Sequence, residues 1–130
     1  MLVVDASCLY EVLIDAPHSE SVRQRLVDDS DHVAPSLIDV EVLHVIRRHL
    51  AHGVLDRTTA HQAVDDLRTW PGERFGHRSL LERAWELRNS IRTYDAVYVA
   101  LAEAMSGTLI TLDARLAHAL GPRCEVELLR

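Results

Sequence analysis

The chain has 130 residues, of which 48% are hydrophobic and 26% are charged, and these proportions are typical of one compact globular domain. Its formal net charge of −6 excludes a protein that holds nucleic acid over a broad basic surface. All 14 basic residues are arginine, which excludes any reaction that needs a lysine ammonium group or Schiff base. Any contact with nucleic acid must therefore be local.

The cysteine content and the hydropathy pattern indicate the compartment. Cys8 and Cys124 are too few and too far apart in the sequence for a disulfide framework, so we expect two free thiols in a reducing compartment. Asp5 interrupts the first apolar run, and no later run is long enough to cross a membrane. We expect a cytoplasmic protein without a signal peptide or a membrane-spanning segment.

Apolar periodicity and stop signals predict short strands that alternate with helices. The predicted strands cover residues 2–4, 32–34, 74–77, 108–112 and 125–129, and the predicted helices cover residues 7–14, 20–27, 36–52, 58–70, 79–87, 94–105 and 114–120. This alternation is typical of a parallel sheet with helices on both faces. We therefore predict a three-layer α/β/α fold.

Polar residues and glycines predict how two of these helices begin or end. Ser36 and Asp39 have the spacing of a capping box at the start of the long helix. Thr93 precedes the helix at 94–105, and Gly107 follows it. The sequence thus predicts hydroxyl caps at both helix starts and a glycine stop at the end of the second helix.

Two aspartates directly follow predicted strands. Asp5 ends the first apolar run, and Asp113 ends the run at 108–112. One explanation is that each aspartate only caps the helix after it. The other is that the two strands are neighbours in the sheet. Their carboxyl ends would then lie at the same edge, which is where ligands bind in such folds. Both carboxylates would then meet in one crevice and repel each other unless a cation compensated.

Two further acidic residues lie on helices that are otherwise largely apolar. Glu41 lies beyond the capping positions of the long helix, where the alternative is a surface ion pair with Arg48. Asp95 is in the first turn of its helix, where a carboxylate also stabilises the helix dipole. The dipole does not explain acidic residues on four separate elements. Such oxygen ligands suit hard cations such as Mg²⁺ or Mn²⁺ and do not suit zinc. The predicted ligands are Asp5, Glu41, Asp95 and Asp113.

Four stretches of the sequence together resemble the PIN-domain ribonucleases, and within them the toxins of VapBC-type toxin–antitoxin pairs. The stretches are Val4-Asp5-Ala6-Ser7, Pro35-Ser36-Leu37 through Glu41 to Ile46-Arg47-Arg48, Tyr94-Asp95-Ala96-Val97-Tyr98-Val99-Ala100-Leu101-Ala102, and Thr111-Leu112-Asp113-Ala114-Arg115-Leu116. The resemblance spans the whole chain. It implies a PIN-like α/β/α fold with a small, mostly parallel sheet and a single PIN domain over residues 1–130.

The resemblance also implies roles for these residues. The catalytic, metal-binding carboxylates would be Asp5, Glu41, Asp95 and Asp113, supported by the hydroxyls of Ser7 and Thr111. The cofactor would be Mg²⁺ or Mn²⁺, and the reaction hydrolysis of RNA phosphodiester bonds by an endoribonuclease toxin. Its partners would be the RNA substrate, a cognate VapB-type antitoxin that neutralises it, and a second copy in a homodimer. Arg115 stands where some relatives carry a further acidic residue.

Basic residues near these motifs are candidates for contacts with substrate. The arginines expected to contact RNA phosphates are Arg47, Arg48 and Arg92. The alternative for each is a solvated surface side chain. The histidines of the long helix, His44, His49 and His52, lack the spacing of a zinc motif. We expect them to be surface or half-buried side chains.

Two other functions fit parts of the pattern. Phosphoryl-transfer domains of the receiver or haloacid-dehalogenase type also gather aspartates at strand ends, but they usually depend on a lysine, which this chain lacks. A catalytically silent PIN-like module that binds RNA or protein is the remaining alternative. Four acidic side chains disfavour it, because unpaired buried charges are costly when they have no task.

Overall fold

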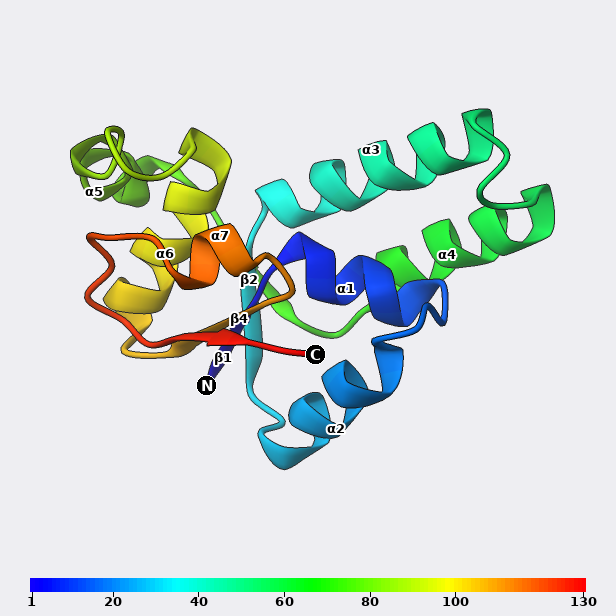
Figure 1. The fold of residues 1–130 in the computed structure, drawn as a ribbon, viewed down its shortest axis with the longest axis horizontal. Helices are drawn as coiled ribbons and strands as arrows, with labels where there is room; N and C mark the ends of the chain where they lie inside the picture. The colour runs from blue at the N-terminus through cyan, green and yellow to red at the C-terminus, as the bar shows by residue number, and fades with distance from the viewer.

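The computed structural model describes residues 1–130 and contains a five-stranded sheet between two layers of helices (Figure 1). The strands are β1 (Leu2–Val4), β2 (His32–Pro35), β3 (Glu73–Phe75), β4 (Thr108–Thr111) and β5 (Val126–Leu128). The helices are α1 (Ala6–Leu13), α2 (Ser19–Asp28), α3 (Leu37–Ala51), α4 (Arg57–Thr69), α5 (Leu81–Glu86), α6 (Thr93–Met105) and α7 (Ala114–Ala117), and a 3₁₀ turn, η1 (Arg78–Leu80), precedes α5. The predicted elements are confirmed in type and order and differ by a few residues at their ends.

The sheet is parallel throughout, in the order β3-β2-β1-β4-β5. The predicted α/β/α fold is therefore confirmed, with a wholly parallel sheet rather than a mostly parallel one. From β1 the chain first builds outward through β2 and β3 and then returns to place β4 on the other side of β1. Ligands bind at such a switch point, beyond the carboxyl ends of the two central strands.

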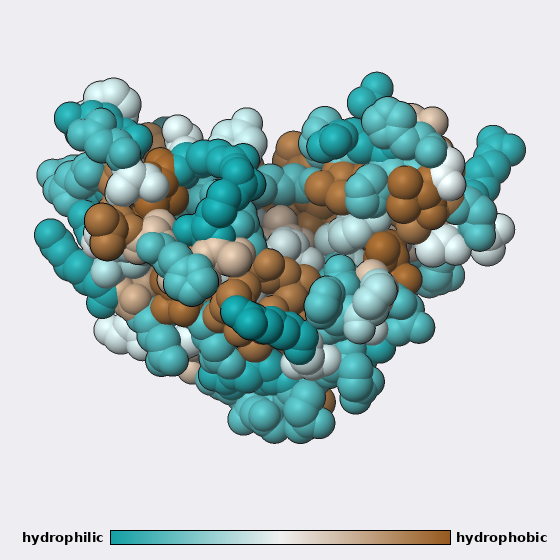
Figure 2. Space-filling view, in the orientation of Figure 1, coloured by the Kyte–Doolittle hydropathy of each residue, from teal (hydrophilic) through white to brown (hydrophobic).

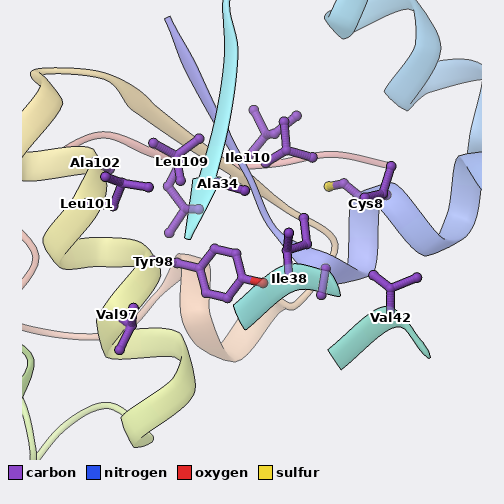
Figure 3. Close-up of a cluster of buried hydrophobic side chains, with 14 of the residues drawn as sticks. Cys8, Ala34, Ile38, Val42, Val97, Tyr98, Leu101, Ala102, Leu109 and Ile110 are labelled. Atoms are coloured by element: carbon purple, nitrogen blue, oxygen red, sulfur yellow. The ribbon is translucent and has the colours of Figure 1, made fainter. Parts of the chain in front are cut away.

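The core explains why the central strands read as unbroken apolar runs. All three residues of β1 are fully buried, and Leu109 and Ile110 of β4 are too, because helices cover both faces of the sheet. On one face lies α6, which packs against β1, β2 and β4 and whose residues 96–102 are all buried. On the other face α1 packs against β4 and α3. Figure 3 shows the ring of Tyr98 reaching from α6 toward Ile38 of α3.

Helices α3 and α4 form an arm that extends beyond the sheet (Figure 1). The buried residues of these two helices recur three or four positions apart, as in any amphipathic pair; they are Ile38, Val42 and Ile46 of α3 and Ala60, Ala63 and Leu67 of α4. The first turns of α3 remain beside the sheet, so one end of the arm borders the switch point. None of the helices combines the length and apolar character that crossing a bilayer requires, and both cysteines are free.

The predicted capping box of α3 is wrong. Ser36 is the residue before the helix, but its side chain makes no capping hydrogen bond. The backbone N–H of Leu37 instead donates to Nε2 of His77 at 2.9 Å, and the carboxylate of Asp39 accepts from Arg74. Both partners come from the β3 region, so the start of α3 is fixed by contacts that local sequence spacing cannot reveal.

The ends of α6 also differ from the prediction. The helix begins at Thr93, so the preceding residue is Arg92, and no side chain caps it. At the other end the left-handed residue is Ser106, with φ of +52°, while Gly107 donates its N–H to the Ala102 carbonyl at 2.9 Å. A Cβ on Gly107 would lie 3.1 Å from the Met1 carbonyl oxygen. The glycine therefore serves close approach to the N-terminus rather than a left-handed backbone.

Arg74 joins α3, α4 and β3. Its guanidinium donates to the Asp39 carboxylate at 2.9 Å and to the carbonyls of Leu67, Trp70 and Gly72 at 3.0, 2.6 and 2.8 Å. It also lies over the Trp70 ring, 4.8 Å from the centroid. One planar cation thus satisfies the carbonyls at the end of α4 and ties this turn to α3, which carries Glu41.

Replacing Arg74 tests this connection. We expect Arg74→Ala to lower the free energy of unfolding by about 2–3 kcal/mol, because it leaves several acceptors without a donor, and Arg74→Lys to recover only part, since an ammonium lacks the planar fork. Denaturant titration measures both. The control is Arg68→Ala, which removes an exposed ion pair to Asp65 and should change stability by less than about 0.5 kcal/mol. Equal effects of the two alanine variants would contradict this role.

Candidate active site

The four predicted carboxylates line one cavity of about 430 Å³ at the switch point of the sheet. Asp5 directly follows β1, and Asp113 lies just past β4. Glu41 comes from the second turn of α3 and Asp95 from the first turn of α6. In the space-filling view the surface is hollowed between the side formed by α5–α7 and the arm of α3 and α4 (Figure 2). Side chains from four separate elements thus converge here.

Asp5 is the most deeply placed of the four, with 6% of its surface exposed. Its Oδ2 accepts hydrogen bonds from Ser7 Oγ and Thr111 Oγ1, both at 2.7 Å, so both predicted supporting hydroxyls contact it. Burial raises the pKa of Asp5, and these two hydrogen bonds oppose the rise. Asp5 makes no side-chain cap to α1, so capping does not explain it.

The two hydroxyls also order the loop that carries Asp113. Ser7 Oγ accepts from the N–H of Leu112 at 3.1 Å, and Thr111 Oγ1 accepts from the N–H of Asp113 at 3.0 Å. Each hydroxyl therefore donates to Asp5 and accepts from the backbone after β4. Through these two hydroxyls, the buried carboxylate of Asp5 fixes the backbone at the end of β4.

Asp113 does cap the helix after it, unlike Asp5. Its Oδ1 accepts from the N–H of Arg115 at 2.9 Å, and the guanidinium of the same arginine lies 3.7 Å from that oxygen. This leaves Oδ2 of Asp113 without a hydrogen bond inside the protein. Capping and ligand binding are thus compatible, because they use different oxygens.

Glu41 is half-buried without a partner. Its Oε1 makes no hydrogen bond, and neither does the nearby hydroxyl of Tyr98, although both atoms are buried. The predicted alternative, an ion pair with Arg48, does not form. Burial raises the pKa of Glu41 to about 7, with the Tyr98 hydroxyl opposing the rise and the Asp5 carboxylate adding to it. The Tyr98 hydroxyl lies near Glu41 but falls short of hydrogen-bond geometry, so Oε1 is available to a ligand.

Asp95 lies in the same field of negative charge. Burial raises its pKa to about 6, and the carboxylates of Asp5 and Asp113 raise it further, whereas Arg92 and Arg115 lower it. No hydrogen bond to its carboxylate forms, so only the charges of Arg92 and Arg115 and the dipole of α6 offset the burial. Like charges that raise one another's pKa mark a site that a cation stabilises.

The site offers carboxylate oxygens, which are the ligands that hard divalent cations prefer, and several of these oxygens have no hydrogen bond. The free oxygens are Oδ1 of Asp5, Oε1 of Glu41, the carboxylate of Asp95 and Oδ2 of Asp113, and all four residues border one cavity. No three acidic, histidine or cysteine side chains have the mutual spacing of a closed metal site. Binding an ion therefore requires some of these side chains to rotate inward.

The arginines predicted to contact RNA occupy different places. Arg92 precedes α6 and, with Arg115, lines a second cavity of about 190 Å³ that also borders two of the carboxylates. Arg47 and Arg48 are exposed on α3 and do not line the carboxylate cavity. Of the three, only Arg92 is next to the site.

The cavity also contains residues that the sequence analysis did not place there, namely Tyr10, Glu11, His18 and His49. His49 is half-buried, as predicted, but its location beside the carboxylates was not anticipated. One signal was present in the sequence. Glu41, Val45 and His49 are spaced four residues apart, so they share one face of α3 and line the same cavity.

Comparisons with known proteins agree with this geometry. The family model described as PIN domain matches residues 2–120. Ribonuclease VapC1 of Mycobacterium tuberculosis is 39% identical over 129 residues, which cover 98% of this chain and 97% of that protein. Ribonuclease VapC12 of the same species is 34% identical over 128 residues, 98% of each chain.

Solved structures share the fold at lower sequence identity. FitAcB from Neisseria gonorrhoeae aligns with a TM-score of 0.73 and 16% identity over 97% of this chain and 96% of that one. VapBC2 from Rickettsia felis, bound to a DNA fragment from their promoter, aligns with a TM-score of 0.70 and 14% identity over 99% and 98%. These alignments extend along nearly the whole chain and support the α/β/α architecture.

The raised pKa values predict how stability depends on pH in the metal-free protein. Glu41 and Asp95 hold protons more tightly when folded, with pKa values of about 7 and 6, than when unfolded, so stability falls as the pH rises from about 4 to about 7. Thermal unfolding in chelator should thus occur at a higher temperature at about pH 5 than at about pH 8.

Glu41→Gln should raise the free energy of unfolding at about pH 8 by on the order of 1 kcal/mol, allowing for solvent screening, and should flatten the pH profile. The exposed Glu82 on α5 supplies the control, because Glu82→Gln should leave the profile unchanged. A metal-free protein that gains stability between about pH 5 and 8 would contradict the raised pKa values of Glu41 and Asp95.

Proposed function

Because the chain belongs to the PIN-domain family, we propose that it is a divalent-metal-dependent endoribonuclease that hydrolyses RNA phosphodiester bonds as the toxin of a toxin–antitoxin pair. Its relatives at 39% and 34% identity are named ribonucleases. The observation that carries the proposal is the convergence of four carboxylates on one cavity, with Glu41 Oε1 buried and unpartnered. A silent binding module has no need for such an arrangement, which is costly to bury.

The residues that would hold Mg²⁺ or Mn²⁺ are Asp5, Glu41, Asp95 and Asp113. When bound, the ion supplies positive charge that lets an RNA phosphate enter among the carboxylates and stabilises charge on the phosphate during hydrolysis. We propose a 5′-phosphate and a 3′-hydroxyl as the product ends. The protein's own contribution is geometric: Ser7 and Thr111 hold Asp5 and the start of the Asp113 loop in place.

The carboxylates also act before any cleavage. With four negative side chains around one cavity, the metal-free site repels the RNA backbone. Among the predicted RNA contacts, Arg92 is the one next to the site, because it lines the adjoining cavity of about 190 Å³ together with Asp95 and Asp113. We propose that it contacts the phosphate backbone at the edge of the site. Arg47 and Arg48 lie farther along α3 and would contact RNA only outside the cavity.

The partners in this proposal are a VapB-type antitoxin and a second copy of the chain, and the location is the cytoplasm, where the RNA is. The exposed apolar side chains support contacts with other chains, since large apolar residues are seldom exposed together without a partner. They include Val40 and Leu43 on α3, and Leu81 and Trp85 on α5, with Trp85 67% exposed.

Purified protein and a random-sequence single-stranded RNA pool test the activity. Cleavage should require added Mg²⁺ or Mn²⁺, and Asp95→Asn should reduce kcat by at least about 100-fold, because it removes a ligand and a charge that act together. Asp31→Asn, at an exposed position, is the matched control and should retain activity. Isothermal calorimetry should show weaker Mn²⁺ binding for Asp95→Asn only.

Undiminished cleavage in excess chelator, or by Asp95→Asn, would contradict the proposal. RNA binding by the wild-type protein without cleavage in the presence of Mg²⁺ or Mn²⁺ would favour the silent binding module instead.

A further inference from the structure

The end of the carboxylate cavity near α1 contains a tyrosine and two histidines that the metal site does not use. They are Tyr10, His18 and His49. Tyr10 lies on α1, His49 lies near the end of α3, and His18 immediately precedes α2. This end of the cavity therefore joins three elements, and two of them also hold carboxylates or their supports.

The side chains of Tyr10 and His49 are in direct contact. The Tyr10 hydroxyl is hydrogen-bonded to Nδ1 of His49, and the two rings meet edge to face with centroids 5.2 Å apart and an angle of 77°. Tyr10 is buried and His49 is half-buried. Burial raises the pKa of Tyr10, so its hydroxyl stays protonated and can donate. His49 then accepts at Nδ1 and carries its proton at Nε2, which has no partner in the protein.

The charged side chains that line the cavity around this pair are mainly acidic. Five acidic residues line the cavity, namely Asp5, Glu11, Glu41, Asp95 and Asp113, and no arginine does. The side chains there that can carry positive charge are His18 and His49. An RNA strand that places one phosphate among the carboxylates brings its flanking phosphates close to the same negative charges, where a donor would stabilise them. The arginines on α3 do not lie in the cavity, so the histidines are the donors available at this end.

We propose that His49, positioned by Tyr10, binds the RNA phosphate that flanks the scissile one. This rests on the proposed RNA cleavage and adds a substrate subsite to it. His49 lies eight residues beyond Glu41 on the same face of α3, about 12 Å along the helix axis. The imidazole Nε2–H is a suitable donor to a phosphate oxygen, and a hydrogen bond to a charged acceptor is stronger than one between neutral groups. His18, at the rim, is placed to assist.

The test compares histidines of one helix. His44 is exposed on α3 and does not line the cavity, so His44→Gln is the matched control for His49→Gln. We expect His49→Gln to raise KM for a random-sequence single-stranded RNA pool about tenfold, as for loss of a hydrogen bond to a charged group, with kcat within about twofold. His44→Gln should change neither constant.

Binding is measured separately from cleavage. In an Asp95→Asn background, fluorescence anisotropy with the same RNA pool should show about tenfold weaker binding after His49→Gln. The affinity for Mn²⁺ in the otherwise wild-type protein, measured by calorimetry, should not change. Tyr10→Phe keeps the ring but loses the hydroxyl, so it should weaken RNA binding severalfold. His49→Arg should restore much of the affinity, because it returns donors and charge.

The outcomes separate this inference from the function on which it rests. If the wild-type protein cleaves RNA and His49→Gln and His44→Gln bind it equally well, the subsite is overturned, and a protein ligand becomes the better occupant of this end of the cavity. If thermal melts show that Tyr10→Phe or His49→Gln has lost affinity because the variant is unfolded, His49→Arg is the deciding variant. Failure of a folded His49→Arg to exceed His49→Gln in RNA affinity would then overturn it. Absence of any RNA cleavage or binding by the wild-type protein would overturn the proposed function as well.

Discussion

The buried carboxylate of Asp5, at the end of β1, organises the site around it. A carboxylate with 6% exposure is stable only when hydrogen bonds or charge compensate its lost hydration. Ser7 and Thr111 supply two such bonds, and the same hydroxyls accept from the backbone of the next strand end. The parallel pairing of β1 with β4 makes this possible, because it places both strand ends at one edge.

The remaining carboxylates are arranged around this anchor at a cost in stability. Glu41 and Asp95 are held in partly buried positions, where burial raises their pKa values and neighbouring negative charge raises them further. The fold tolerates them because α6 and the central strands form a largely apolar core beneath the site. Tyr98 contributes to both the core and the site. Its ring belongs to the core in Figure 3, while its hydroxyl lies without a hydrogen bond beside Glu41. The apolar core below the cavity thus stabilises the fold, and the repulsion between like charges is limited to the cavity itself.

The fold and the carboxylates were predictable from the sequence because each leaves a local signal. Unbroken apolar runs that end in Asp5 and Asp113 identify buried parallel strands and their carboxyl ends. Contacts between distant segments left no such signal. The start of α3 is fixed by His77 and Arg74 rather than by the predicted Ser36 cap, and His49 enters the cavity only because α1 packs against α3. Which histidine faces a site is decided by packing, which the spacing of residues does not encode.

We propose that these four side chains bind one hard cation together. Anomalous diffraction from crystals soaked in Mn²⁺ would locate that ion and its ligands. We expect one dominant peak in the cavity, with oxygen ligands about 2.1 Å away from at least three of the residues Asp5, Glu41, Asp95 and Asp113. A strongest peak elsewhere on the molecule, or a Mn²⁺-saturated crystal in which these carboxylates stay apart around no ion, would contradict it.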